Sequence, residues 1–115
     1  METNNNKDEN TQLLIQLVKI TEELENTFQY LIPIVYNISN KSHNSTLSQT
    51  IKSDVQSLRF IMYDKLNTFK NFKNQFENDL MQICNHEWIT DYIDISEYES
   101  KKIVYCDKCK LTKQS

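Results

Sequence analysis

The sequence predicts a mainly α fold with a small β hairpin: an antiparallel two-helix hairpin, packed like a coiled coil, followed by a C-terminal pair of short strands. Three features of the sequence support this expectation. Apolar residues recur at the helical period from about residue 10 to residue 83. Beyond residue 83, β-branched and aromatic residues cluster instead. The 115 residues include no glycine, which excludes glycine-rich phosphate loops and removes the residue on which positive-φ turns usually depend.

The first helix is expected over about residues 10–38, after a polar, low-complexity segment, residues 1–9, that we expect to be a disordered tail. Pro33 lies inside the helical pattern and predicts a kink or an interruption, because proline removes a backbone donor and clashes with the preceding turn. The apolar line of this helix comprises Leu13, Leu17, Ile20, Leu24, Phe28, Leu31, Val35 and Ile38.

A polar connection over residues 39–45 separates this helix from a second, longer one, expected over about residues 46–83. Thr46, followed three residues later by Gln49, matches a capping box at its start. No proline or glycine interrupts the pattern. Its apolar line comprises Leu47, Ile51, Val55, Leu58, Met62, Leu66, Phe69, Phe72, Phe76, Leu80 and Ile83.

Two helices alone would leave much apolar surface uncovered, because several large apolar residues lie beside or off these two lines. This predicts a third packing partner, either the C-terminal module folded back or a second copy that completes a four-helix bundle. A protein partner or a homodimer is therefore expected. The residues concerned are Ile34, Tyr36, Phe60, Ile61 and Tyr63.

The C-terminal segment predicts a short β hairpin. Its strands are expected at Trp88–Ile95 and Lys102–Tyr105, where β-branched and aromatic residues dominate. The polar segment between them has no glycine, so a longer loop is expected in place of a two-residue turn.

Four metal-ligating side chains flank this hairpin. Cys84 and His86 precede the first strand, and Cys106 and Cys109 follow the second, so antiparallel pairing brings the two pairs together. Three thiolates and one imidazole suit one tetrahedral Zn²⁺. The alternatives are a redox C-x-x-C, which lacks a surrounding βαβ pattern, and inert buried thiols.

We expect this zinc to be structural and the protein to have no enzymatic activity, hence no catalytic residue. A catalytic zinc keeps one position open for water, whereas four protein ligands fill the shell here. Glu87 beside His86 suggests a general base, but the helical H-E-x-x-H motif needs a second histidine where Thr90 stands. His43 falls in the polar connection, outside the ligand set.

The charge distribution leaves one alternative function open. A formal net charge of −3 argues against a general nucleic-acid clamp. A lysine-rich C-terminus nevertheless permits a nucleic-acid-binding or transcription accessory factor that uses the zinc-bound tip. These lysines are Lys101, Lys102, Lys108, Lys110 and Lys113.

The sequence also bears on location. It shows no basic region followed by an apolar stretch at its start, and its longest apolar run, Leu31–Tyr36, is too short to span a membrane. We therefore expect an intracellular protein, in a host cytoplasm or a virion if viral, with no membrane association and no small-molecule substrate.

The zinc-binding segment resembles a C-x-H-x-W-x-x-D-x-I-D…I-x-Y-C-x-x-C signature. This signature occurs in small, mostly uncharacterised proteins of nucleocytoplasmic large DNA viruses, including mimivirus-like and algal viruses. The resemblance implies a giant-virus origin and a zinc-stabilised hairpin, and it implies no activity. The matching residues are Cys84, His86, Trp88, Asp91, Ile93, Asp94, Ile103, Tyr105, Cys106 and Cys109.

Three further residues are expected to support the metal. Trp88 is placed to shield it from water. Asp91 and Asp94 either accept hydrogen bonds from His86, pair with neighbouring lysines or face solvent. Together these observations predict a zinc-binding interaction or structural protein that uses its helical hairpin for partner binding or self-association.

Overall fold

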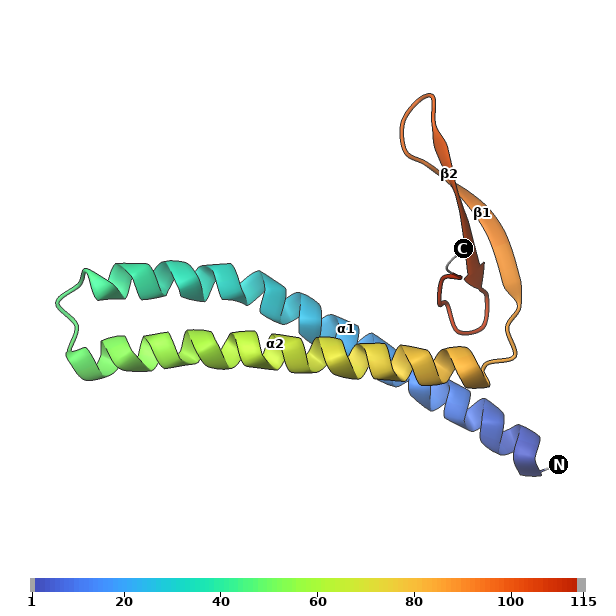
Figure 1. The fold of residues 1–115 in the computed structure, drawn as a ribbon, viewed down its shortest axis with the longest axis horizontal. Helices are drawn as coiled ribbons and strands as arrows, with labels where there is room; N and C mark the ends of the chain where they lie inside the picture. Colours follow the sequence, from blue (N-terminus) through green and yellow to red (C-terminus); the bar gives the residue numbers. More distant parts are fainter. Residues whose placement is uncertain (1, 114–115) are drawn as a thin grey trace. The chain divides into compact units, whose positions relative to one another are not determined.

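The computed structural model describes residues 2–113. In this part of the chain it contains two helices, α1 (Glu2–His43) and α2 (Gln49–Ile83), and two strands, β1 (Trp88–Asp94) and β2 (Ser100–Cys106). Figure 1 shows the two long helices followed by the hairpin of strands. The predicted fold class, mainly α with a C-terminal β hairpin, is confirmed.

Helix α1 is longer than expected at both ends. Residues 2–9, expected as a disordered tail, form its first turns, and Met1 lies outside the described residues. No proline or glycine in this stretch opposes the helix. The helix also continues through Pro33, which lies at an exposed position, so α1 is not interrupted there.

The connection between the helices is shorter than expected, and the cap of α2 differs from the prediction. The Ser48 hydroxyl accepts a hydrogen bond from the Ile51 amide at 3.3 Å, so Ser48 is the N-cap. The predicted Thr46–Gln49 capping box is wrong, because Gln49 is already the first residue of α2. The Lys52 ammonium donates to the His43 carbonyl at 3.2 Å across the connection.

The chain divides into two compact units, one of residues 18–75 and one of residues 1–17 with 76–115. The first unit, which we call the helical hairpin, contains most of α1 and α2. Its core is a cluster of Ile32, Met62 and Leu66, against which Phe28 and Val35 pack. The sequence-based division placed the boundary after Ile83, whereas this boundary lies within the helices.

The two helices of the helical hairpin pack along a seam whose buried and half-buried positions alternate in steps of three and four residues. This is the spacing of a coiled coil. The edge-to-face ring pair Phe28–Phe69, with centroids 5.2 Å apart, crosses the seam, as does the 3.9 Å ion pair between Lys73 and Glu25. The seam positions are 18, 21, 25, 28, 32, 35, 39 and 42 on α1, and 52, 55, 59, 62, 66, 69 and 73 on α2.

This seam corrects the predicted apolar line of α1. Phe28 and Val35 belong to both, but Ile20, Leu31 and Ile38 of the predicted line are exposed. The seam instead includes polar residues such as Thr21 and Ser42. The most apolar line of α1 is therefore not the one that packs against α2.

In the other unit, β1 and β2 pair antiparallel from Trp88↔Cys106 to Asp94↔Ser100. The strands match the expected ones to within two residues at each end. The Ile95 amide donates to the Glu99 carbonyl at 2.9 Å and closes the connecting loop. The segment after β2 folds back along it, through a bridge between Tyr105 and Thr112.

Candidate metal site

The four predicted ligands come together, and this confirms the zinc site expected from the sequence. Cys84 follows the last turn of α2, and its amide still donates to the Leu80 carbonyl at 3.0 Å. His86 lies in the link to β1, Cys106 ends β2, and Cys109 lies in the turn beyond it. Their ligand atoms all lie within 4.8 Å of one another, and all three cysteines are free and buried.

Two of the distances between these atoms match the edges of a tetrahedral zinc site, and the whole set lies within 4.8 Å. A Zn–S bond of about 2.3 Å and a Zn–N bond of about 2.0 Å give tetrahedron edges of about 3.8 Å between two sulfurs and about 3.5 Å between sulfur and nitrogen. The Sγ atoms of Cys84 and Cys106 are 3.8 Å apart, and Cys109 Sγ lies 3.6 Å from His86 Nδ1. A soft donor set of this kind selects zinc over the harder divalent cations.

His86 is held with one nitrogen toward the cluster. Its Nε2 lies 2.8 Å from the Met81 carbonyl, a pure acceptor, so Nε2–H donates there and Nδ1 faces the sulfurs. The Trp88 ring stacks on the imidazole with centroids 4.5 Å apart, as its expected role of shielding the metal requires. The Asp91 carboxylate accepts a hydrogen bond from the Tyr92 amide at 2.8 Å, whereas the Nε2–H of His86 donates to the Met81 carbonyl.

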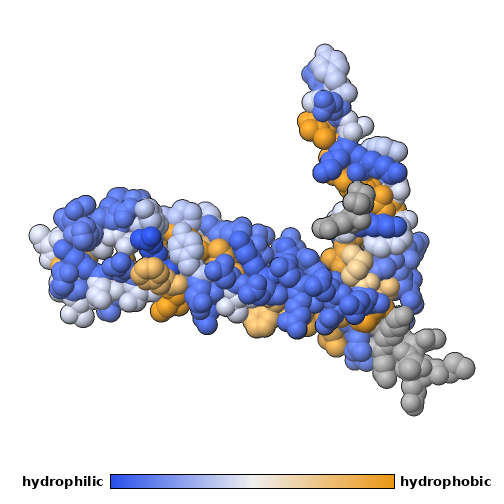
Figure 2. All heavy atoms as spheres, in the orientation of Figure 1, coloured by the Kyte–Doolittle hydropathy of each residue, from blue (hydrophilic) through white to orange (hydrophobic). Residues whose placement is uncertain are grey.

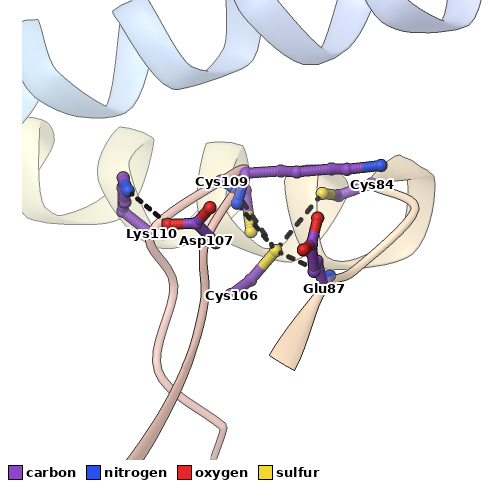
Figure 3. A network of polar contacts seen from close by, with 7 residues as sticks. Cys84, Glu87, Cys106, Asp107, Cys109 and Lys110 are labelled. Carbon is purple, nitrogen blue, oxygen red and sulfur yellow. Dashed lines mark hydrogen bonds and ion pairs between the residues drawn. The ribbon is translucent and has the colours of Figure 1, made fainter. Parts of the chain in front are cut away.

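Main-chain amides surround the Cys106 sulfur. It accepts hydrogen bonds from Glu87, Lys108 and Cys109 at 3.3–3.4 Å. Figure 3 shows the sulfur atoms of Cys84, Cys106 and Cys109 turned toward one another, with the Glu87 amide beside Cys106. Such N–H···S bonds stabilise a thiolate, which is the form that binds zinc.

The electrostatics of the cluster divide the three thiols into two kinds. Burial alone would raise the pKa of Cys106, but the amides of Cys109 and Glu87 and the His86 side chain outweigh it and lower this pKa to about 6. Burial, reinforced by the neighbouring sulfurs of Cys109 and Cys106, raises the pKa of Cys84 to about 12. Burial also raises the pKa of Cys109. Crowded thiols of this kind lose their protons when a cation is bound.

Lys110, directly after the C-x-x-C pair, is the only non-glycine residue of the described chain with a positive φ, at 66°. Its amide donates to the Cys106 carbonyl at 2.9 Å and closes the turn that presents the two sulfurs. Its ammonium pairs with Asp107 at 3.2 Å. Glycine usually serves in such a conformation, and this chain has none.

The other residues considered from the sequence lie outside the ligand set. The Glu87 side chain is exposed, while its main chain contributes the amide to Cys106 and accepts from the Asp107 amide at 2.9 Å. His43 ends α1, in the other unit. A cavity of about 310 Å³ borders Cys84, Asn85 and Lys108.

Sequence reasoning missed the main-chain groups that complete the site, namely the Met81 carbonyl and the three amides on Cys106. Residue type carries no signal for them. In the comparisons with known proteins, no family model, no curated protein and no solved structure matches this chain. Its function is therefore inferred from the chemistry of the four ligands and from the exposed surface.

Proposed function

We propose that the protein is a non-enzymatic, zinc-stabilised structural or interaction protein, in which zinc fixes the C-terminal module and the helical hairpin binds a protein partner. The observation that carries this proposal is the set of four protein ligands within 4.8 Å. Four ligands complete a tetrahedral shell, which leaves no position for a reacting water.

The exposed apolar surface of the helical hairpin supports the second half of the proposal. Phe60 and Ile61 are 60% and 55% exposed, and Tyr30 is 71% exposed. In Figure 2, apolar side chains reach the surface of the helices among polar ones. Apolar surface of this extent is typical of an interaction site.

Nucleic-acid binding is the weaker candidate. Of the lysines that would contact phosphates, Lys110 pairs with Asp107, and the Lys113 ammonium lies 5.4 Å from the centre of the Trp88 ring. A gel shift with single- and double-stranded DNA and RNA separates the two functions, because phosphate-driven binding weakens steeply with added salt.

The origin and the compartment are proposed on narrower grounds. The giant-virus origin rests on the resemblance of the zinc-binding signature alone. An intracellular or virion location rests on that origin and on the sequence pattern. In the part of the chain that the structure describes, neither helix is long and apolar enough to cross a membrane.

Metal content and metal coordination test the structural role of zinc. Purified protein should contain one zinc per chain, and X-ray absorption at the zinc edge should show three sulfurs and one nitrogen. A shell that includes a water oxygen would contradict the structural assignment. The matched control is Cys106→Ser/Cys109→Ser, which keeps Cys84 and His86 and should lose the metal.

Affinity purification from infected or transfected cells tests the interaction. Wild-type protein should retain a specific protein partner, or a differently tagged second copy of itself. The surface variant Ile61→Glu should lose that partner while it keeps its zinc. Capture of no protein by the wild type, under conditions where its zinc is retained, would refute the interaction role.

A further inference from the structure

A line of exposed apolar residues at regular spacing follows each helix of the helical hairpin. Their side chains are each 36–55% exposed. They form a single set that we call the apolar face. It consists of Ile20, Leu24, Leu31, Ile34 and Ile38 on α1, and Ile51, Leu58 and Ile61 on α2.

The apolar face repeats with the same steps of three and four residues as the seam. Each line has one polar residue at a position that this spacing requires, Thr27 on α1 and Asp54 on α2. Steps of three and four are the spacing of a helix contact line in a coiled coil. Scattered surface residues would show no such order.

The exposed line on α1 is more apolar than the buried one. Between residues 18 and 42, the seam has four apolar residues at its eight positions, whereas the exposed line from residue 20 to residue 38 has five at six. Burial of apolar surface is the main favourable term in folding and association. A chain that buries its less apolar line leaves the more apolar line available for a second packing contact.

The position of the apolar face indicates the architecture that covers it. If the seam residues occupy heptad positions a and d, the apolar face occupies c and g, about 100° around each helix. In an antiparallel pair of helices the g positions of both border the same side of the seam, so the two lines form one surface. Each helix of a four-helix bundle contacts two neighbours in this way.

We propose that the apolar face docks on the same face of a second copy of this chain, forming a four-helix bundle whose two-fold axis runs parallel to the helices. The proposal rests on the proposed function, in which the helical hairpin is the interaction element, and it names the partner. It makes no use of the zinc site.

The contacts between α1 and α2 show which of their residues lie at the same height along the helix axis. Residues at the same height meet across the two-fold axis. The Phe28–Phe69 ring pair and the Arg59 guanidinium, 4.4 Å from the Tyr36 ring centre, align α1 with α2. At these levels Ile34 meets the partner copy's Ile61, and Ile38 meets its Leu58. Lys41 then meets the partner copy's Asp54, so opposite charges face each other at the loop end.

The area is sufficient for a stable dimer. The eight side chains of the apolar face, taken at their exposed fractions, offer roughly 650 Å² per copy, so two copies bury about 1,300 Å². Stable, specific interfaces bury about 1,200–2,000 Å² in total. A contact between copies with the same patch on both sides also closes on itself and forms no filament.

Two neighbouring residues of α2 give a matched test. Ile61 belongs to the apolar face, whereas Phe60 is equally exposed but lies on the other side of the seam. Light scattering and sedimentation equilibrium over a range of micromolar concentrations should show a dimer for the wild type and for Phe60→Glu. Ile61→Glu should weaken the dimer at least ~100-fold, because it buries an unpaired carboxylate.

Helical circular dichroism and zinc content are measured on the same three proteins, and we expect both to be unchanged. A wild-type monomer throughout, equal behaviour of the two variants, or a dimer that withstands Ile61→Glu would overturn the proposal. If the wild type forms the dimer but contains no zinc, the proposed dimer is supported and only the proposed structural role of zinc is contradicted.

Discussion

At the scale of single residues, the site shows what a chain without glycine does where glycine normally serves. Lys110 adopts φ 66° because the turn after Cys109 must close onto the Cys106 carbonyl. A residue with a Cβ atom costs roughly 1–2 kcal/mol in this region. The Lys110–Asp107 pair is exposed and offsets little of that cost.

Replacing this lysine with glycine should therefore stabilise the protein. We expect Lys110→Gly to raise the free energy of unfolding of the zinc-bound form by about 0.5–1 kcal/mol, after the entropy cost of glycine is deducted. Urea unfolding with zinc in excess measures it. Lys108→Gly is the control, because φ at Lys108 is not positive, and it should destabilise. A loss of stability in both variants would show that the turn carries no strain.

The thiol pKa values predict how zinc affinity depends on pH. In the metal-free protein Cys84 has a pKa of about 12 and that of Cys109 is raised, so around pH 8 both hold protons that zinc must displace. Cys106, with a pKa of about 6, has already lost its proton there. Affinity should thus rise with pH, roughly 100-fold per unit where these two protons are released. It should rise more steeply at lower pH, because the hydrogen bond with Cys106 raises the pKa of His86, which must also lose a proton to bind zinc.

Competition with a chelator of known affinity, at several pH values around pH 8, measures this slope. Calorimetry in buffers of different ionisation enthalpy counts the released protons directly. An affinity that does not change with pH would mean that the thiols of Cys84 and Cys109 are already ionised before zinc binds.

At the scale of elements, the order of helices and strands follows from the sequence pattern. The ligand set follows as well, because the spacing of Cys84, His86, Cys106 and Cys109 makes chemical sense only when the strands pair. Main-chain contributors such as the Met81 carbonyl are different. They belong to every residue type, so no sequence pattern identifies them.

The seam between the helices was the less predictable part. A hydrophobic pattern reports how apolar each helix face is, and it does not report which neighbour that face packs against. On α1 the most apolar face is not the face that packs against α2, since Thr21 and Ser42 are buried while Ile20 and Ile38 are exposed. The start of α2 at Gln49 could not be predicted either, because Thr46 and Ser48 are both residue types that commonly cap a helix.

Pro33 provides a prediction at this scale, because α1 passes through it without a break. Pro33 is exposed, so its replacement leaves the seam intact. The new residue also has a backbone amide, which can donate to the Gln29 carbonyl one turn earlier. We expect Pro33→Ala to stabilise the protein by about 1–3 kcal/mol and to raise its helical signal. Thermal and urea unfolding measure this. The control is Asn37→Ala, at an exposed position one turn further along α1, which should change the free energy of unfolding by only about 0.5 kcal/mol. An equal increase in stability in the two variants would refute a special cost of Pro33.

At the scale of the whole molecule, different interactions stabilise the two units, apolar packing in one and metal binding in the other. The helical hairpin has an apolar cluster around Ile32, Met62 and Leu66. The strands have no comparable core in the described chain, since residues 90–102 are exposed throughout. An isolated pair of strands is at best marginally stable in water, so the metal and its ligands must supply what packing does not.

Zinc removal should therefore unfold one part of the chain and spare the other. On addition of a strong chelator to the full chain, we expect residues 84–113 to lose their structure while residues 18–75 keep most of their helical circular dichroism. The sole tryptophan, Trp88, reports on the first event, because the loss of its stacking on His86 should expose it to water and shift its emission to longer wavelength. Cys106→Ser/Cys109→Ser should show the shifted emission without chelator, whereas Cys106→Ser alone tests whether three ligands suffice. An emission and a melting curve that chelator leaves unchanged would mean that the β1–β2 pairing and the return segment at Thr112 hold the hairpin without metal.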